Sequence, residues 1–121
     1  MTLDSGAQEE WTDEASGYDC TMYRSSLGHL CGYVRLPTEH PLCGIDYGDV
    51  DWMRVDILLS VHGGITFSEE EDGKGRLDAG YWYGFDCAHH GDDPAVQDEN
   101  YVRAECAQLA AQLRALEATN G

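Results

Sequence analysis

The clearest apolar periodicity lies in the C-terminal part of the chain. After residue 98 the apolar side chains recur at intervals of three and four residues, at Val102, Cys106, Leu109, Leu113 and Leu116. This spacing gathers them on one face of a helix. Asp98 or Asn100 can cap the first turn, and Asn120-Gly121 is typical of a helix stop. We therefore predict one long amphipathic helix here.

The preceding region shows strand-like patterns separated by turn residues. Strands are predicted over residues 20–24 and 30–35, which form a hairpin, over 55–62, from 65 to 67 after a Gly-Gly turn, and over 81–86. The prolines and glycines between residues 36 and 51 indicate a loop that lies over the body of the protein. Residues 69–75 are interpreted as a solvated loop because they are acidic and contain glycine. Within 81–86, alternation separates Tyr81, Tyr83 and Phe85 from Trp82 and Gly84.

Strands followed by a terminal helix indicate an α+β fold. We predict a single domain over residues 18–121, with an antiparallel sheet of about four to five strands and the long helix packed on one face. Residues 1–17 are acidic and are interpreted as a partly ordered lead-in, with Trp11 holding it to the domain. Alternatively, the apolar face of this helix could form the interface of a homo-oligomer.

The charge balance restricts the classes of partner. Seven basic residues face 23 acidic ones, which gives a formal net charge of −16. Such a surface repels phosphate backbones and anionic membranes, so we expect neither direct nucleic-acid binding nor membrane binding. No apolar run approaches the roughly 20 residues of a membrane span, and the N-terminus lacks the pattern of a signal peptide. We expect a cytoplasmic protein whose five cysteines stay reduced.

The densest group of reactive side chains follows the strand over residues 81–86. It contains Asp86, Cys87, His89, His90 and Asp92. A metal site needs about four converging ligands, and Cys87, His89, His90 and Asp92 are the candidates for an ion such as zinc. No second ligand pair has the spacing of a zinc finger, so we expect no metal or other cofactor. Cys87 beside His89 could also form a thiol nucleophile, although no oxyanion-hole motif accompanies the pair.

Several segments carry a family resemblance. They are Gly28-His29-Leu30-Cys31-Gly32-Tyr33-Val34, His40-Pro41-Leu42, Val61-His62-Gly63-Gly64-Ile65-Thr66-Phe67, Trp82-Tyr83-Gly84-Phe85-Asp86-Cys87-Ala88-His89-His90-Gly91-Asp92 and Tyr101 to Leu113. Together they resemble a widespread group of small bacteriophage and prophage proteins. The resemblance implies a bacterial host cytoplasm and an accessory role that acts on the host. Between Phe67 and Tyr81 this chain departs from the group, whose other members carry a longer insert there.

These observations lead to three hypotheses of function. The first is a non-enzymatic, counter-defence-like accessory protein that sequesters a small polar, nucleotide-derived ligand. Its ligand-binding residues would be Arg54, His62, Gly63, Gly64, Trp82, Asp86, His89 and Asp92. The alternative is an acidic inhibitor that binds a basic host protein. The second alternative is a metal- or thiol-dependent hydrolase centred on Cys87 and His89.

Overall fold

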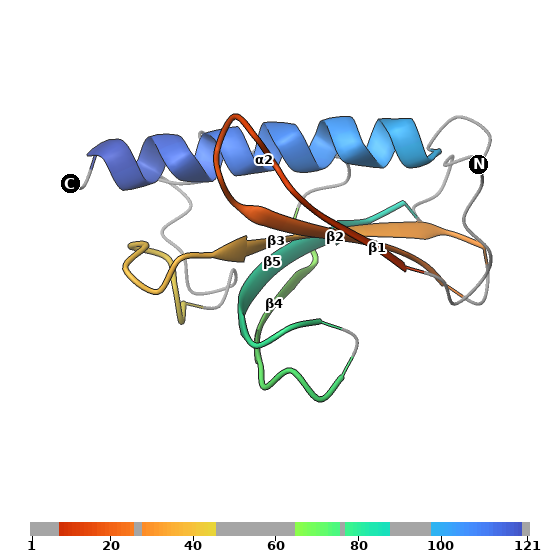
Figure 1. Ribbon diagram of the computed structural model, residues 1–121, viewed down its shortest axis with the longest axis horizontal. Helices are drawn as coiled ribbons and strands as arrows, with labels where there is room; N and C mark the ends of the chain where they lie inside the picture. Colours follow the sequence, from red (N-terminus) through yellow and green to blue (C-terminus); the bar gives the residue numbers. More distant parts are fainter. Residues whose placement is uncertain (1–7, 26–27, 46–64, 76, 88–97, 120–121) are drawn as a thin grey trace.

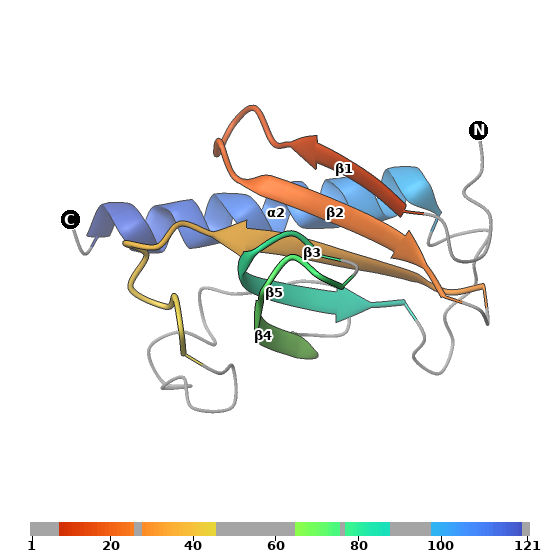
Figure 2. The same cartoon turned by 60° about the horizontal axis from the view of Figure 1, so that its bottom comes forward.

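The fold is a five-stranded antiparallel sheet with one long helix packed on it. The computed structural model describes residues 8–25, 28–45, 65–75, 77–87 and 98–119. The strands are β1 (Gln8–Thr12), β2 (Asp19–Arg24), β3 (Leu30–Leu36), β4 (Phe67–Glu71) and β5 (Gly80–Asp86), and the helix is α2 (Glu99–Thr119). The strand order is β1-β2-β3-β5-β4 (Figures 1 and 2). The predicted α+β fold is confirmed, whereas the strand predicted over residues 55–62 and its Gly-Gly turn lie outside the described residues.

The helix begins and packs as its sequence predicts. The backbone N–H of Tyr101 donates to Asp98 Oδ1 at 3.0 Å, so Asp98 is the N-cap. All five apolar positions of the predicted stripe are buried within the chain. They pack over β3 and β2, and Figure 1 shows the helix lying along one face of the sheet. The stripe therefore serves the core of the domain.

Alternation along the strands divides the sheet into a core face and an open face. Tyr81, Tyr83 and Phe85 belong to the core that the helix covers, whereas Trp82 does not, which confirms the predicted separation. The open face, turned toward the viewer in Figure 2, carries the alternate residues of each strand. The register aligns them in rows across the sheet, one of which runs Thr12, Asp19, Arg35, Trp82 and Glu69.

Two acidic segments form strands that the sequence patterns do not reveal. Gln8–Thr12, within the predicted lead-in, pairs with β2, and Trp11 packs against the core as expected. The interpretation of residues 69–75 as a loop is wrong for Glu69–Glu71, which complete β4 and pair with β5. Both segments are edge strands, where a charged side chain can remain in solvent while the backbone pairs on one side.

The segment after β3 folds back onto the helix, as predicted for the described part of this loop. His40 is 3% exposed, and Leu42 is part of the core. The Nε2–H of His40 donates to the Leu113 carbonyl at 2.8 Å, while Nδ1 accepts from the Leu42 N–H at 3.0 Å. The imidazole therefore joins this segment to the C-terminal half of α2.

The helix approaches the sheet closely at Gly32. A Cβ atom at Gly32 would lie 2.6 Å from Phe85 Cζ and 2.8 Å from Cys106 Sγ, whereas one at Gly75 would meet nothing within 4 Å. We expect Gly32→Ala to lower the free energy of unfolding by about 1–3 kcal/mol through overpacking. Gly75→Ala, the matched control, should leave it nearly unchanged. Equal denaturant midpoints for the two variants would contradict this account of the interface.

A buried phenol should make stability depend on pH in the alkaline range. Tyr18 is buried and donates its hydroxyl hydrogen to the Glu117 carboxylate. Burial, followed by the hydrogen bond and charge of Glu117, raises the pKa of Tyr18 well above its usual value. The unfolded chain therefore loses this proton more readily, so the stability contributed by Tyr18 is complete below about pH 10 and falls as the pH rises further.

The variant Tyr18→Phe isolates this contribution. Near neutral pH we expect it to be less stable than the wild type by about 1–3 kcal/mol, since it lacks a hydrogen bond to a charged acceptor. Above about pH 10 the difference should shrink. Denaturant unfolding of both proteins from pH 7 upward measures it, and parallel stability curves would rule out the proposed role of the phenol.

Candidate functional site

Most residues of the predicted ligand site lie outside the described part of the chain. Of the ligand-binding candidates, Trp82 and Asp86 are described, and those outside the described residues are Arg54, His62, Gly63, Gly64, His89 and Asp92. Of the metal-ligand candidates, Cys87 is described, and His89, His90 and Asp92 are not. The predicted pocket between the Gly-Gly turn and the loop after β5 therefore stays a prediction. The same holds for the hydrolase centred on Cys87 and His89.

The described members of that set occupy different surroundings. Asp86 accepts a hydrogen bond from Thr66 Oγ1 at 3.1 Å at the end of β5. Cys87 is buried in the core, and its backbone N–H donates to the Leu30 carbonyl at 2.9 Å. Trp82, which is 1% exposed, lies on the open face beneath the Arg35 guanidinium, whose Cζ is 5.5 Å from the indole centroid. Its Nε1–H donates to the Asp78 carbonyl at 2.9 Å.

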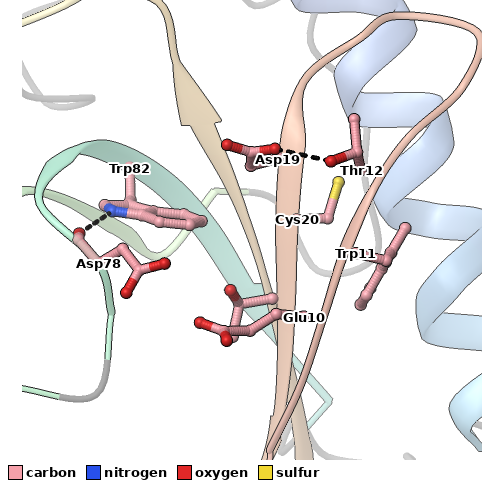
Figure 3. A pocket seen from close by; sticks show the side chains of 8 residues that line it. Glu10, Trp11, Thr12, Asp19, Cys20, Asp78 and Trp82 are labelled. Carbon is pink, nitrogen blue, oxygen red and sulfur yellow. Dashed lines mark hydrogen bonds between the residues drawn. The ribbon is translucent and has the colours of Figure 1, made fainter.

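A pocket of about 290 Å³ lies beside Trp82 on the open face (Figure 3). Its lining comes from β1, β2, β5 and the β4–β5 connection: Glu10, Trp11, Thr12, Asp19, Cys20, Thr21, Asp78 and Trp82. Trp11 and Cys20 pack against or within the core, so the pocket's polar side chains come from the alternate positions of β1 and β2 and from Asp78. Figure 3 shows the carboxylates of Glu10 and Asp78 directed toward the space between them.

The pocket is acidic. Glu10, Asp19 and Asp78 supply three carboxylates. Asp19 forms an ion pair with Arg35 and accepts a hydrogen bond from Thr12 Oγ1 at 2.9 Å, so part of its charge is compensated. Glu10 and Asp78 are exposed at the mouth of the pocket. An adjoining hollow of about 230 Å³ is lined by both Arg35 and Asp19. Because these two residues form an ion pair, the hollow beside the acidic pocket carries no excess positive charge from Arg35.

The arginines that the structure describes are all engaged in ion pairs. Arg24 pairs with Glu99, Arg35 with Asp19, Arg103 with Glu9, and Arg114 with Glu117. Arg103 also lies over Trp11, with its Cζ 4.3 Å from the ring centroid. Arg24 and Arg103 join the sheet to the helix, whereas the Arg35 pair lies within the sheet and the Arg114 pair within α2. Binding a phosphate through any of these guanidinium groups would require breaking an existing pair.

Sequence reasoning missed Glu10, Thr12, Asp19, Thr21 and Asp78. The relevant signal was the alternation of polar side chains in 8–12 and 19–23, which places one from every second position on the same face. This alternation alone did not predict the pocket, because neither segment's pattern shows that the two segments pair with each other. Asp78 enters through the path of the β4–β5 connection, which the sequence does not specify.

Neither metal nor thiol chemistry has support within the described residues. No three His, Cys, Asp or Glu side chains gather there in a group that could hold a metal ion. Cys20, Cys87 and Cys106 are buried, and a hydrogen bond with Cys20, together with burial, raises the pKa of the Cys106 thiol well above its usual value. Burial and the nearby Glu70 and Glu39 charges raise the pKa of Cys43.

Comparison with known proteins identifies no relative. No protein-family model, curated protein or solved structure matches the chain. Among the described residues, α2 is the longest element, and no helix is apolar enough over sufficient length to cross a bilayer. Evidence for function therefore comes from the geometry and charge of the pocket.

The burial of the thiols predicts a pattern of chemical labelling. Cys31 and Cys43 are half-buried, so we expect iodoacetamide to modify both in the folded protein, and Cys43 more slowly because its raised pKa leaves less thiolate. Cys20, Cys87 and Cys106 should react only after unfolding, because the reagent needs an accessible thiolate. Peptide mass spectrometry after native and denatured labelling measures this difference. Rapid native modification of Cys87 would instead revive the reactive-thiol hypothesis.

Proposed function

We propose that this chain is a non-enzymatic accessory protein of the phage type, and that it acts by binding a basic partner protein through the open face of its sheet. The observation that carries the proposal is the acidic pocket on that face, in a part of the chain whose arginines are already paired. A basic surface would find uncompensated carboxylates there, whereas an anionic ligand would be repelled.

Acidic side chains at both edges of the sheet extend this surface. Glu10 is on β1 at one edge, and Glu69 and Glu71 on β4 share the open face at the other edge. The net charge of −16 adds long-range attraction for a cationic partner, which accelerates encounter and weakens as salt screens it. An inhibitor of a basic host factor could use this attraction to compete with the factor's natural anionic ligand.

Sequestration of a nucleotide-derived ligand stays a prediction, and it would use a different site from the acidic pocket. Its phosphate-binding candidates, Arg54, His62, Gly63, Gly64 and His89, belong to the part of the chain that the structure does not describe. The two hypotheses require opposite charges at the ligand, so a single series of titrations can separate them.

The test of the proposed function is the salt dependence of binding to a peptide rich in arginine and lysine. We expect measurable binding at low salt that weakens steeply as salt is added. Replacement of Glu69, Glu70 and Glu71 by Gln and of Asp72 by Asn should weaken it, since these substitutions remove four negative charges near one edge. Isothermal calorimetry provides the affinities.

Two results would count against the proposal. One is the absence of binding to the basic peptide at low salt, and the other is an affinity that neither salt nor the four substitutions change. Titration with cyclic and linear nucleotides in the same buffer supplies the comparison, because heat from those ligands alone would favour the nucleotide hypothesis.

A further inference from the structure

We propose that the outer edge of β1 binds an extended, cationic segment of the partner as an additional strand of the sheet. This inference rests on the proposed function and adds to it the form in which the partner is bound. β1 stands at one end of the strand order, so β2 pairs with one of its edges and no described strand pairs with the other. Figure 2 shows β1 at the upper margin of the sheet.

The hydrogen bonds of the β1–β2 hairpin show which backbone groups lie at this outer edge. The N–H of Asp13 donates at 2.8 Å to the carbonyl of the residue just before β2. Bonded and non-bonded pairs alternate along an antiparallel ladder, so Trp11 is the next residue bonded to β2. Glu10 and Thr12 occupy the non-bonded positions, and their N–H and C=O groups point outward. No hydrogen bond to these groups is found among the described residues.

Solvent reaches this edge in the free protein. Glu10 and Thr12 are both exposed, so water can satisfy their outward backbone groups. An added strand would replace these water contacts by backbone hydrogen bonds, which is the usual chemistry of strand addition. The net gain from each such bond is small, so the side chains beside the edge must decide which strand binds.

Side-chain contacts hold β1 in the position that an added strand requires. Arg103 of α2 pairs with Glu9, and its Cζ lies 4.3 Å from the Trp11 ring centroid. Thr12 Oγ1 donates to Asp19 Oδ1 of β2 at 2.9 Å. Because these contacts order β1 before the partner arrives, little conformational entropy is lost from this strand on binding.

The charge beside the edge favours a cationic occupant. A strand added to β1 would place alternate side chains next to those of β1 on the open face, where Glu10 lies. Glu10 is exposed and has no ion-pair partner among the described residues. A lysine or arginine opposite Glu10 would therefore form a cross-strand pair of opposite charges, which stabilises strand pairing.

The same charge disfavours a second copy of this chain at the edge. Two β1 strands side by side would bring the adjacent Glu9 and Glu10 of one copy close to those of the other. Like charges opposite one another destabilise a strand pair, and charged side chains on edge strands commonly prevent self-association in this way. A cationic strand gains from these glutamates, whereas a second copy loses.

The test separates backbone pairing from charge attraction. Thr12→Pro removes the outward N–H and the hydroxyl, while Thr12→Ala, the matched control, removes the hydroxyl alone. The probe is a short peptide of alternating lysine and threonine. A second peptide has the same sequence with N-methyl groups on alternate residues, and a third has glutamate in place of lysine. Calorimetry at low salt gives the affinities, and amide hydrogen exchange locates the binding.

We expect the lysine peptide to slow exchange at the Glu10 and Thr12 amides. Thr12→Pro should bind it about fivefold more weakly than Thr12→Ala, which is the order expected from one lost backbone hydrogen bond. The N-methylated peptide should bind the wild type more weakly by at least as much, and the glutamate peptide should not bind. Slow exchange at the Trp11 amide of Thr12→Pro verifies that the β1–β2 ladder persists. If that protection is lost, the N-methylated peptide decides the question alone.

Different failures would overturn different claims. Equal affinity of the N-methylated and unmodified peptides would refute strand addition and leave the acidic binding function standing. Equal affinity of the glutamate peptide would refute selection by charge. Protection of the Glu10 and Thr12 amides that appears with protein concentration alone would assign the edge to a second copy of the chain. No binding of any cationic peptide at low salt would refute the proposed function itself.

Discussion

The structure depends on the burial of one helical stripe against one face of a sheet. A single helix can cover only one face, and α2 lies over β3 and β2. The interface is close enough that Gly32 leaves room for Phe85 and Cys106, and it buries the apolar residues of the central strands. No second described helix covers the other face of the sheet, so its side chains must be compatible with solvent. The polar residues at alternate positions of β1 and β2 are compatible with solvent, and they also line the pocket.

Arginines among the described residues form ion pairs that connect the strands and the helix. Arg24 joins β2 to the first turn of α2, and Arg103 joins the same helix to β1 through Glu9. Arg35 joins β3 to β2 and donates to the Ala79 carbonyl in the β4–β5 connection at 3.1 Å. Such pairs contribute modestly where they are exposed. Their larger consequence is electrostatic, because positive charge consumed in internal pairs leaves the acidic groups of the surface uncompensated.

The sequence predicted the elements whose patterns are dictated by burial. The stripe from Val102 to Leu116 and the alternation of Tyr81 and Tyr83 arise because one side of each element contacts the core, so fold class and helix position follow. The edge strands β1 and β4 have weak apolar patterns, since much of their surface stays in solvent. The pocket was unpredictable for a related reason. Its residues meet only through strand pairing and the course of a connection, and pairing is a long-range property that local periodicity does not contain.

Charge and shape contribute to recognition in different ways on this surface. A net charge of −16 attracts every basic protein, and that attraction raises encounter rates without selecting a partner. Selection requires contacts that only a correctly placed side chain can make. Glu10 and Asp78 can provide such contacts because β1 and the β4–β5 connection fix where their carboxylates lie. A partner with diffuse positive charge would gain only the screened long-range attraction, whereas one with a cationic side chain in the right position would also contact these carboxylates. The open face would therefore discriminate among basic proteins by geometry.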